Sequence, residues 1–197
     1  MTVAYEFNPM PHIVAVRCPG CGSEASFEFA EIVEIKSRND IEYFETSKSF
    51  EYARLQAAHG QHLNAAIYFH GLRSTTVDAV DDLPEDYKPS DWDHSASHGS
   101  TRSIDLGTLV CTACGKRSKH TLDWPQDAYY QIEHRGEVLW AFDRESASEL
   151  LEYVKSDDRK RDSYRYKLFL MKVPSVFLGK KVRGPISKKL QGLLSNT

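Results

Sequence analysis

The alternation of apolar and polar residues predicts a series of short β-strands. Compact apolar or alternating runs are expected to form single strands at residues 12–16, 104–110 and 118–122. Residues 25–35 are rich in Phe, Ile and Val, and a polar turn at 37–40 connects them to the apolar residues 41–44. We expect a hairpin there, and a second hairpin around the turn Arg135-Gly136, which joins residues 129–133 to 138–142.

Helical spacing of apolar residues dominates two other regions. Residues 47–67 predict an inserted helical segment with a break or kink at Gly60. In the C-terminal part, helices are expected at residues 146–154, 164–171 and 185–194. Pro174 is expected to end the second of these helices, and Pro185 to begin the third. The aspartate-rich segment 78–104, which ends in a Ser/His/Gly-rich run, predicts a mobile loop.

These elements together predict an α+β fold. An antiparallel β body with the inserted helical segment is expected over residues 1–143, and a basic helical region over 144–197 is expected to pack on that body. The expected cores include Trp140 and Phe142 of the second hairpin, together with Phe169 and Phe177 of the C-terminal region.

Composition and charge narrow the class of protein. The 197 residues are 41% hydrophobic and 27% charged, which is ordinary globular usage, and no apolar run approaches the roughly 20 residues that a membrane helix needs. We expect a cytoplasmic protein without a membrane partner. Residues 1–154 carry a net charge of −12, whereas residues 155–197 carry +9. Such polarity predicts either an anionic partner for the basic region or docking of that region on the acidic body.

All four cysteines fall into two pairs of the form Cys-x-x-Cys-Gly. The pairs are Cys18 with Cys21 and Cys111 with Cys114. Two intervening residues let both sulfurs of a pair reach one ion, and a glycine after the second cysteine tolerates the positive φ of such a turn. Four thiolates match the closed tetrahedral coordination of structural Zn(II), so the sequence predicts one structural zinc ion per chain.

The segments RCPGCG at 17–22 and VCTACG at 110–115 resemble the zinc-ribbon superfamily. The resemblance covers about thirty residues, as expected for two such knuckles and the strands beside them. It implies that each pair lies at the tip of a β-hairpin and that Cys18, Cys21, Cys111 and Cys114 are the metal ligands. One departure is clear, because the 89 residues 22–110 separate the pairs where roughly 15–20 are usual. An insertion must therefore lie between the knuckles, with its two ends close together.

Other uses of the four thiols stay open at this stage. Iron in a rubredoxin-type site would take the same ligands. A redox-active Cys-x-x-Cys normally begins a helix, whereas strand-like residues follow both pairs here. Because a zinc ion with four thiolates has no open position, the expected role of the metal is to hold the fold.

The basic C-terminal region is the main candidate for partner binding. Its cations are interleaved with aromatic residues, a mixture that suits phosphate neutralisation and base stacking. The predicted nucleic-acid-binding residues are Arg159, Lys160, Arg161, Arg165, Lys180, Lys181, Arg183, Lys188 and Lys189. The alternatives are a protein partner and an ordinary solvated helix surface.

We therefore expect a non-enzymatic, structural-zinc protein that binds DNA or RNA, with no small-molecule substrate. The first alternative is an accessory subunit of a nucleic-acid-processing complex. The second is a hydrolase using scattered histidines, with candidates at His62, His70, His94 and His98. A second metal site within Asp91, Asp93, His94 and His98 is a further alternative, although the serines and glycine of this segment favour a solvated acidic loop. The sequence contains no G-x-S-x-G, Walker A, G-x-G-x-x-G or H-E-x-x-H motif.

Overall fold

The computed structural model describes residues 10–56, 62–94 and 105–195 and has the α+β character that the sequence predicts. The chain divides into two compact units, one of residues 1–25 with 123–197 and the other of residues 26–122. The expected boundary between residues 143 and 144 is not a boundary of these units. One division falls inside strand β2, Glu24–Phe29.

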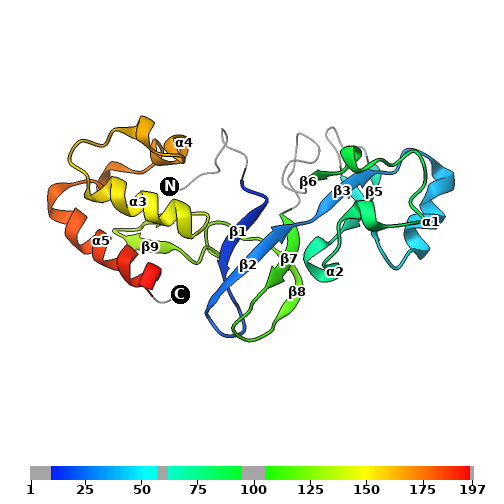
Figure 1. Ribbon diagram of the computed structural model, residues 1–197, viewed down its shortest axis with the longest axis horizontal. Coiled ribbons are helices and arrows are strands. Elements are labelled where there is room, and N and C mark those ends of the chain that lie inside the picture. Colours follow the sequence, from blue (N-terminus) through cyan, green and yellow to red (C-terminus); the bar gives the residue numbers. More distant parts are fainter. Residues whose placement is uncertain (1–9, 57–61, 95–104, 196–197) are drawn as a thin grey trace. The chain divides into compact units, whose positions relative to one another are not determined.

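Four strands form the sheet that carries both cysteine pairs, in the order β1-β2-β7-β8. Besides β2, they are β1 (Ile13–Arg17), β7 (Leu106–Val110) and β8 (Arg117–Thr121), and Figure 1 shows the four side by side. The strands expected at 12–16, 104–110 and 118–122 are therefore confirmed over the described residues, to within a residue or two. Strands β2 and β7 pair antiparallel, and Phe27 and Leu109 face each other as fully buried partners.

A second sheet, of order β4-β5-β3-β6, lies within residues 26–122. Its strands are β3 (Glu31–Glu34), β4 (Glu51–Gln56), β5 (His62–Tyr68) and β6 (Asp93–His94). The helix predicted for residues 47–67 is therefore wrong over the described residues 47–56 and 62–67, and the expected break at Gly60 lies outside the described residues. Ala65, Ala66, Ile67 and Tyr68 are all buried, and they alternate between two core clusters on opposite faces of the sheet. A strand buried on both faces gives a continuous apolar run without a period of two, which sequence alone does not distinguish from a buried helix.

The first expected hairpin is also corrected. Residues 41–44 belong to helix α1 (Ile41–Thr46), which directly follows the 3-10 turn η1 (Arg38–Asp40). The Ser37 hydroxyl accepts a hydrogen bond from the backbone N–H of Asn39, 3.2 Å away, and so caps this turn. The polar residues 37–40 thus begin a helical segment, because serine caps helical turns as readily as it forms β-turns.

The acidic segment contributes to the core of the second sheet. Residues 78–94 are largely irregular, as expected of a loop, with the short turns η3 (Val77–Ala79) and η4 (Pro89–Asp91). Tyr87 and Trp92 are nevertheless buried, and the Trp92 ring stacks on Phe50 at a centroid distance of 5.2 Å. Residues 95–104 of the predicted loop lie outside the described residues. Two aromatic side chains in the acidic run therefore anchor its described part.

The hairpin predicted around Arg135-Gly136 is confirmed as β9 (Gln131–His134) and β10 (Glu137–Trp140). Arg135 and Gly136 have φ values of 55° and 77°, as a two-residue type I′ turn requires. Trp140 and Phe142 are buried, as expected for core residues of this hairpin.

The helices of the unit formed by residues 1–25 and 123–197 follow this hairpin in the chain. Helix α3 (Arg144–Lys155) confirms the helix expected at 146–154, and α2 (His70–Arg73) is a single turn in the other unit. The helix expected at 164–171 is reduced to α4 (Lys167–Leu170), which the 3-10 turns η5 (Arg161–Ser163) and η6 (Ser175–Phe177) precede and follow. Helix α5 (Lys180–Ser195) begins five residues before the expected start, so Pro185 lies inside it. Phe169 and Phe177 are fully buried, which confirms their expected place in the core.

Candidate functional site

The first cysteine pair lies in the tight connection between β1 and β2. The backbone N–H of Cys18 donates to the carbonyl of Ser23 over 2.9 Å, and the N–H of Gly22 donates to the carbonyl of Cys18 over 2.8 Å. The N–H of Gly20 points at the sulfur of Cys18, 3.4 Å away. Gly22 has φ +76°, the left-handed conformation that glycine adopts without a Cβ clash. The chain thus turns back on itself and directs a backbone donor at a thiol.

The second pair repeats this geometry between β7 and β8. The N–H of Cys111 donates to the carbonyl of Lys116 over 2.8 Å, the same five-residue spacing as Cys18 to Ser23. Gly115 follows the second cysteine with φ +73°. In each pair the first cysteine is buried and the second is exposed. The two pairs are therefore equivalent turns, each joining neighbouring strands of one sheet.

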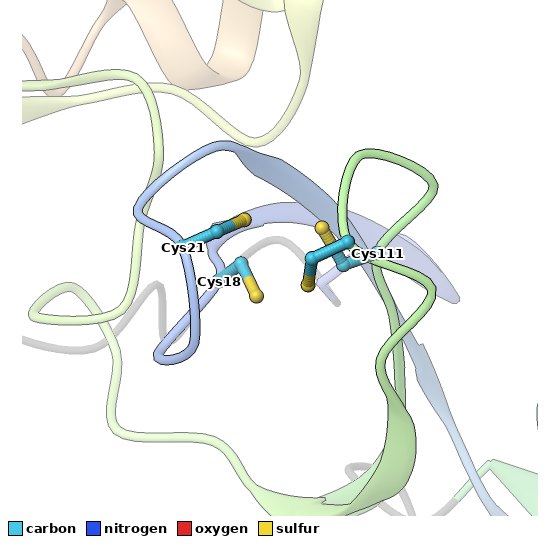
Figure 2. Close-up of side chains that lie close together, drawn as sticks. Cys18, Cys21 and Cys111 are labelled. Carbon is cyan, nitrogen blue, oxygen red and sulfur yellow. The ribbon is translucent and has the colours of Figure 1, made fainter.

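The four sulfur atoms gather at one point. All of them lie within 4.8 Å of one another, and Figure 2 shows the labelled Cys18, Cys21 and Cys111 with their sulfurs turned toward a common centre. Tetrahedral coordination at about 2.3 Å per bond places sulfurs about 3.8 Å apart, so the cluster has the dimensions that a tetrathiolate metal site requires. The structure thus brings together all four cysteines that the sequence singled out, as a group able to hold one metal ion.

Four of the predicted nucleic-acid-binding residues contact groups that lie farther away along the chain, within their own unit. Arg159 and Arg183 both donate to the carbonyl of Leu178, over 2.7 and 3.1 Å, and Arg183 also contacts Asp157. Hydrogen bonding to Arg183 lowers the pKa of the Asp157 carboxyl below its ordinary value. Both arginines thus contact the carbonyl of Leu178, just before α5 begins.

The other two residues of this group meet acidic or carbonyl groups. Arg165 pairs with Glu145 over 2.8 Å, and its backbone N–H donates to the carboxylate of Glu149. Lys189 donates to the carbonyl of Glu133 over 3.3 Å. The unit of residues 1–25 and 123–197, which contains the basic region, carries a net charge of only +2. Much of the +9 charge is therefore balanced by carboxylates of the same unit.

The remaining predicted cations differ in their exposure to solvent and in the contacts that they make. Lys160 pairs with Asp158 over 3.0 Å, both largely exposed, and the side chain of Arg161 lies outside what the structure describes. Lys180, Lys181 and Lys188 are exposed on α5. Several of the predicted cations thus contact groups of their own unit, whereas these three lysines are exposed on α5.

Two of the four candidate histidines lie beside one carboxylate. The Nε2 atom of His70 is 2.9 Å from an oxygen of Glu31, and His94 lies opposite Glu31 in the β3–β6 pair. His62 is exposed at the start of β5, and His98 lies outside the described residues. Asp91 pairs with Lys36 over 2.9 Å. In the described part of the chain, the cysteines form the one group of three or more potential ligands close enough to share an ion.

Sequence reasoning missed a second group of cations in residues 26–122. Lys48, Arg73, Arg117 and Lys119 are exposed in or near helix α2 and strand β8, where Arg73 contacts the carbonyl of Lys48 and Arg117 contacts Ser74 at the end of α2. The run Lys116-Arg117-Ser118-Lys119 beside the second cysteine pair was the available signal. The prediction of a binding surface was placed instead on the basic C-terminal region, which is much longer than this run.

No helix among the described residues is long and apolar enough to cross a membrane. Searches against protein-family models, curated proteins and solved structures returned no match to this chain.

Proposed function

We propose that Cys18, Cys21, Cys111 and Cys114 bind one Zn(II) ion that holds the fold. The gathering of four sulfurs within 4.8 Å carries this proposal. Thiolates are soft ligands that favour zinc or iron over magnesium and calcium, and zinc needs no redox chemistry to remain in such a site. A reducing compartment such as the cytoplasm would keep the four thiols available for the metal.

The ion would act as a cross-link between distant parts of the chain. It would join two turns that lie 89 residues apart and so close the segment 22–110. A closed loop of this length has fewer conformations in the unfolded chain, which stabilises the folded state. Because all four ligand positions are protein sulfurs, the ion would leave no position for a substrate. We therefore propose binding without catalysis.

Metal content tests the zinc site. Purified protein should contain about one zinc per chain by elemental mass spectrometry, and a chelator should remove it together with the folded structure. The variant Cys111→Ser should lose the metal, whereas the neighbouring variant Thr112→Ser should keep it. Full metal content in Cys111→Ser would contradict shared coordination by the four cysteines. Iron in place of zinc in the purified protein would show that the proposed identity of the metal is wrong.

The second part of the proposal is nucleic-acid binding through α5. Lys180, Lys181 and Lys188 are exposed, and an advance of eight residues along a helix separates Lys180 from Lys188 by about 12 Å. Cations spaced along one helix can neutralise successive phosphates and release their counterions. An accessory role with a protein partner is the competing interpretation.

Oligonucleotide binding tests this part directly. The affinity for single-stranded and duplex oligonucleotides should fall steeply between 50 and 200 mM salt, by roughly 10³ or less for a few phosphate contacts. Changing the three lysines to Gln should weaken binding and lower the salt slope by about 2–3. The matched variant with three Lys→Arg changes keeps the charge and should bind as the parent does. Equal binding by the Gln and Arg variants would remove α5 from the proposed interface.

A further inference from the structure

Helix α2 packs directly on the face of the first sheet that strand β8 completes. It contacts both β7 and β8. Gly71 makes this approach possible, because a β-carbon at that position would lie 2.8 Å from the side chain of Thr108. The end of α2 therefore lies beside the side chains that β8 projects on the same face.

Alternation along β8 places two cations on that face. Lys119 is the cross-strand partner of Thr108, and Arg117 is the partner of Val110, so both project on the side where α2 packs. Both are exposed, whereas His120 on the opposite face packs against Phe27. The Nη1 atom of Arg117 donates to the Ser74 hydroxyl over 3.1 Å. Strand β8 and the end of α2 thus form one continuous polar surface.

The end of α2 adds cations held in fixed positions. Arg73 donates to the backbone carbonyl of Lys48, and its guanidinium lies over the Tyr68 ring at 6.0 Å. Ser74 caps the helix in a left-handed conformation with φ 59°, which is unfavourable for a residue with a β-carbon. The backbone N–H of Ser74 donates to the carbonyl of His70 over 2.8 Å, and the Ser74 hydroxyl accepts a hydrogen bond from Arg117. Such strained positions concentrate at binding sites.

The charge of this surface contrasts with that of its unit. Residues 26–122 have a net charge of −5, yet Arg73, Arg117 and Lys119 lie on or beside the face where α2 packs. Arg73 contacts the backbone of Lys48, and Lys116 precedes Arg117 in the chain. Lys119 pairs with Glu51. In the described part of the chain, Arg73 and Arg117 donate to a neutral carbonyl and a neutral hydroxyl, and neither acceptor balances the charge of a guanidinium. Carboxylates are abundant in this unit, so two guanidiniums that have no carboxylate partner among the described residues point to an external anion.

We propose that this α2–β8 surface, made of Lys48, Arg73, Ser74, Lys116, Arg117 and Lys119, binds the phosphate backbone of a nucleic acid. The inference rests on the nucleic-acid part of the proposed function and adds a second contact surface to it. The large hydrophobic residues that are exposed in the described chain are Ile13, Leu168 and Met171, and all three lie outside residues 26–122. Without an apolar anchor, a protein partner would lack the buried contacts that dominate such interfaces, whereas phosphates need only cationic donors.

The test compares the two surfaces in the full-length, zinc-loaded protein. The double variant Arg73→Gln/Arg117→Gln should bind a 20-nucleotide single strand about tenfold more weakly, with a salt slope lower by about 1.5. The double Arg→Lys variant should retain most of the affinity and the parent's salt slope. Unchanged zinc content and melting temperature in both variants would establish that the fold is intact.

Each outcome separates this inference from the proposed α5 interface. Loss of affinity in the Arg→Gln variant supports the α2–β8 surface, whatever the α5 variant does. Parent-like affinity in the Arg→Gln variant, with loss in the α5 Lys→Gln variant, overturns this inference and leaves the proposed function standing. Absence of oligonucleotide binding by the parent protein overturns both, as would binding of a phosphoserine peptide alone.

Discussion

A β-carbon placed on Gly107 would lie 2.2 Å from the backbone carbonyl oxygen of Glu28. The two residues belong to the paired strands β7 and β2, and the Phe27 ring also approaches this position to 2.6 Å. The close contact leaves no room for a side chain in the sheet that carries the cysteine pairs. We predict that Gly107→Ala lowers the free energy of unfolding by about 1–3 kcal/mol, because strand β7 must shift.

Urea unfolding of zinc-loaded protein would measure this change. Gly192→Ala is the matched control, since Gly192 lies in α5 with open space around its Cα, and alanine there should stabilise the helix by up to about 1 kcal/mol. Equal stability of Gly107→Ala and the parent would contradict the close packing of β2 on β7.

The glycines after the second cysteines give a prediction about the metal site. Gly22 and Gly115 have φ values of +76° and +73°, and nothing lies within 4 Å of a β-carbon at either position. Alanine would therefore meet no neighbour, and its cost would be the left-handed backbone alone, about 1–2 kcal/mol at each site. We expect both variants to release zinc to a chromogenic chelator faster than the parent. A release rate equal to the parent's would show that these turns do not need the left-handed conformation.

Arg183 and Lys188, both predicted from the sequence to bind nucleic acid, should respond differently to removal of charge. The Arg183 side chain is 19% exposed and binds Asp157 and the Leu178 carbonyl, whereas Lys188 is exposed. We predict that Arg183→Gln costs about 1–3 kcal/mol of stability and raises the pKa of Asp157 toward its ordinary value. Lys188→Gln should change stability by less than about 0.5 kcal/mol. Chemical denaturation and NMR titration of Asp157 would check both effects, and equal stability of the two variants would contradict the anchoring role.

Alkaline pH should destabilise the unit of residues 26–122 through Tyr43. Burial, reinforced by the charge of Asp82, raises the pKa of Tyr43 from 10.0 to about 12. In the folded protein the phenol keeps its proton longer than in the unfolded chain. Its contribution to stability is therefore complete below pH 10 and is lost as the pH rises toward 12. Tyr43→Phe should show a smaller loss of stability between pH 9 and about 11 than the parent, as followed by chemical denaturation. If the stability of Tyr43→Phe and that of the parent depended on pH in the same way, the raised pKa of Tyr43 would be contradicted.

The sequence predicted the strands beside the cysteines because each runs from an alternating or apolar segment into a Cys-x-x-Cys turn. It failed at residues 47–67, where burial of both faces of β5 replaced the alternation expected of a strand. It also failed at Ser37, whose hydroxyl caps a helical turn instead of starting a hairpin. Both failures concern tertiary packing or local hydrogen bonding, which residue patterns do not determine.

For the candidate site, too, the sequence identified some features and missed others. Spacing and residue type identified the four cysteines, and the structure gathers them. The basic residues were predicted from charge alone, which does not reveal that Arg165 pairs with Glu145 or that Arg183 pairs with Asp157. The search for runs of charge also missed Arg73 and Arg117. They lie 44 positions apart in the sequence and come together only through α2 and β8.

X-ray absorption at the zinc edge of the purified protein tests the tetracysteine site most directly. We predict four sulfur neighbours at about 2.3 Å and no nitrogen or oxygen neighbour. A first shell with two sulfurs and two lighter atoms would contradict a shared tetracysteine centre.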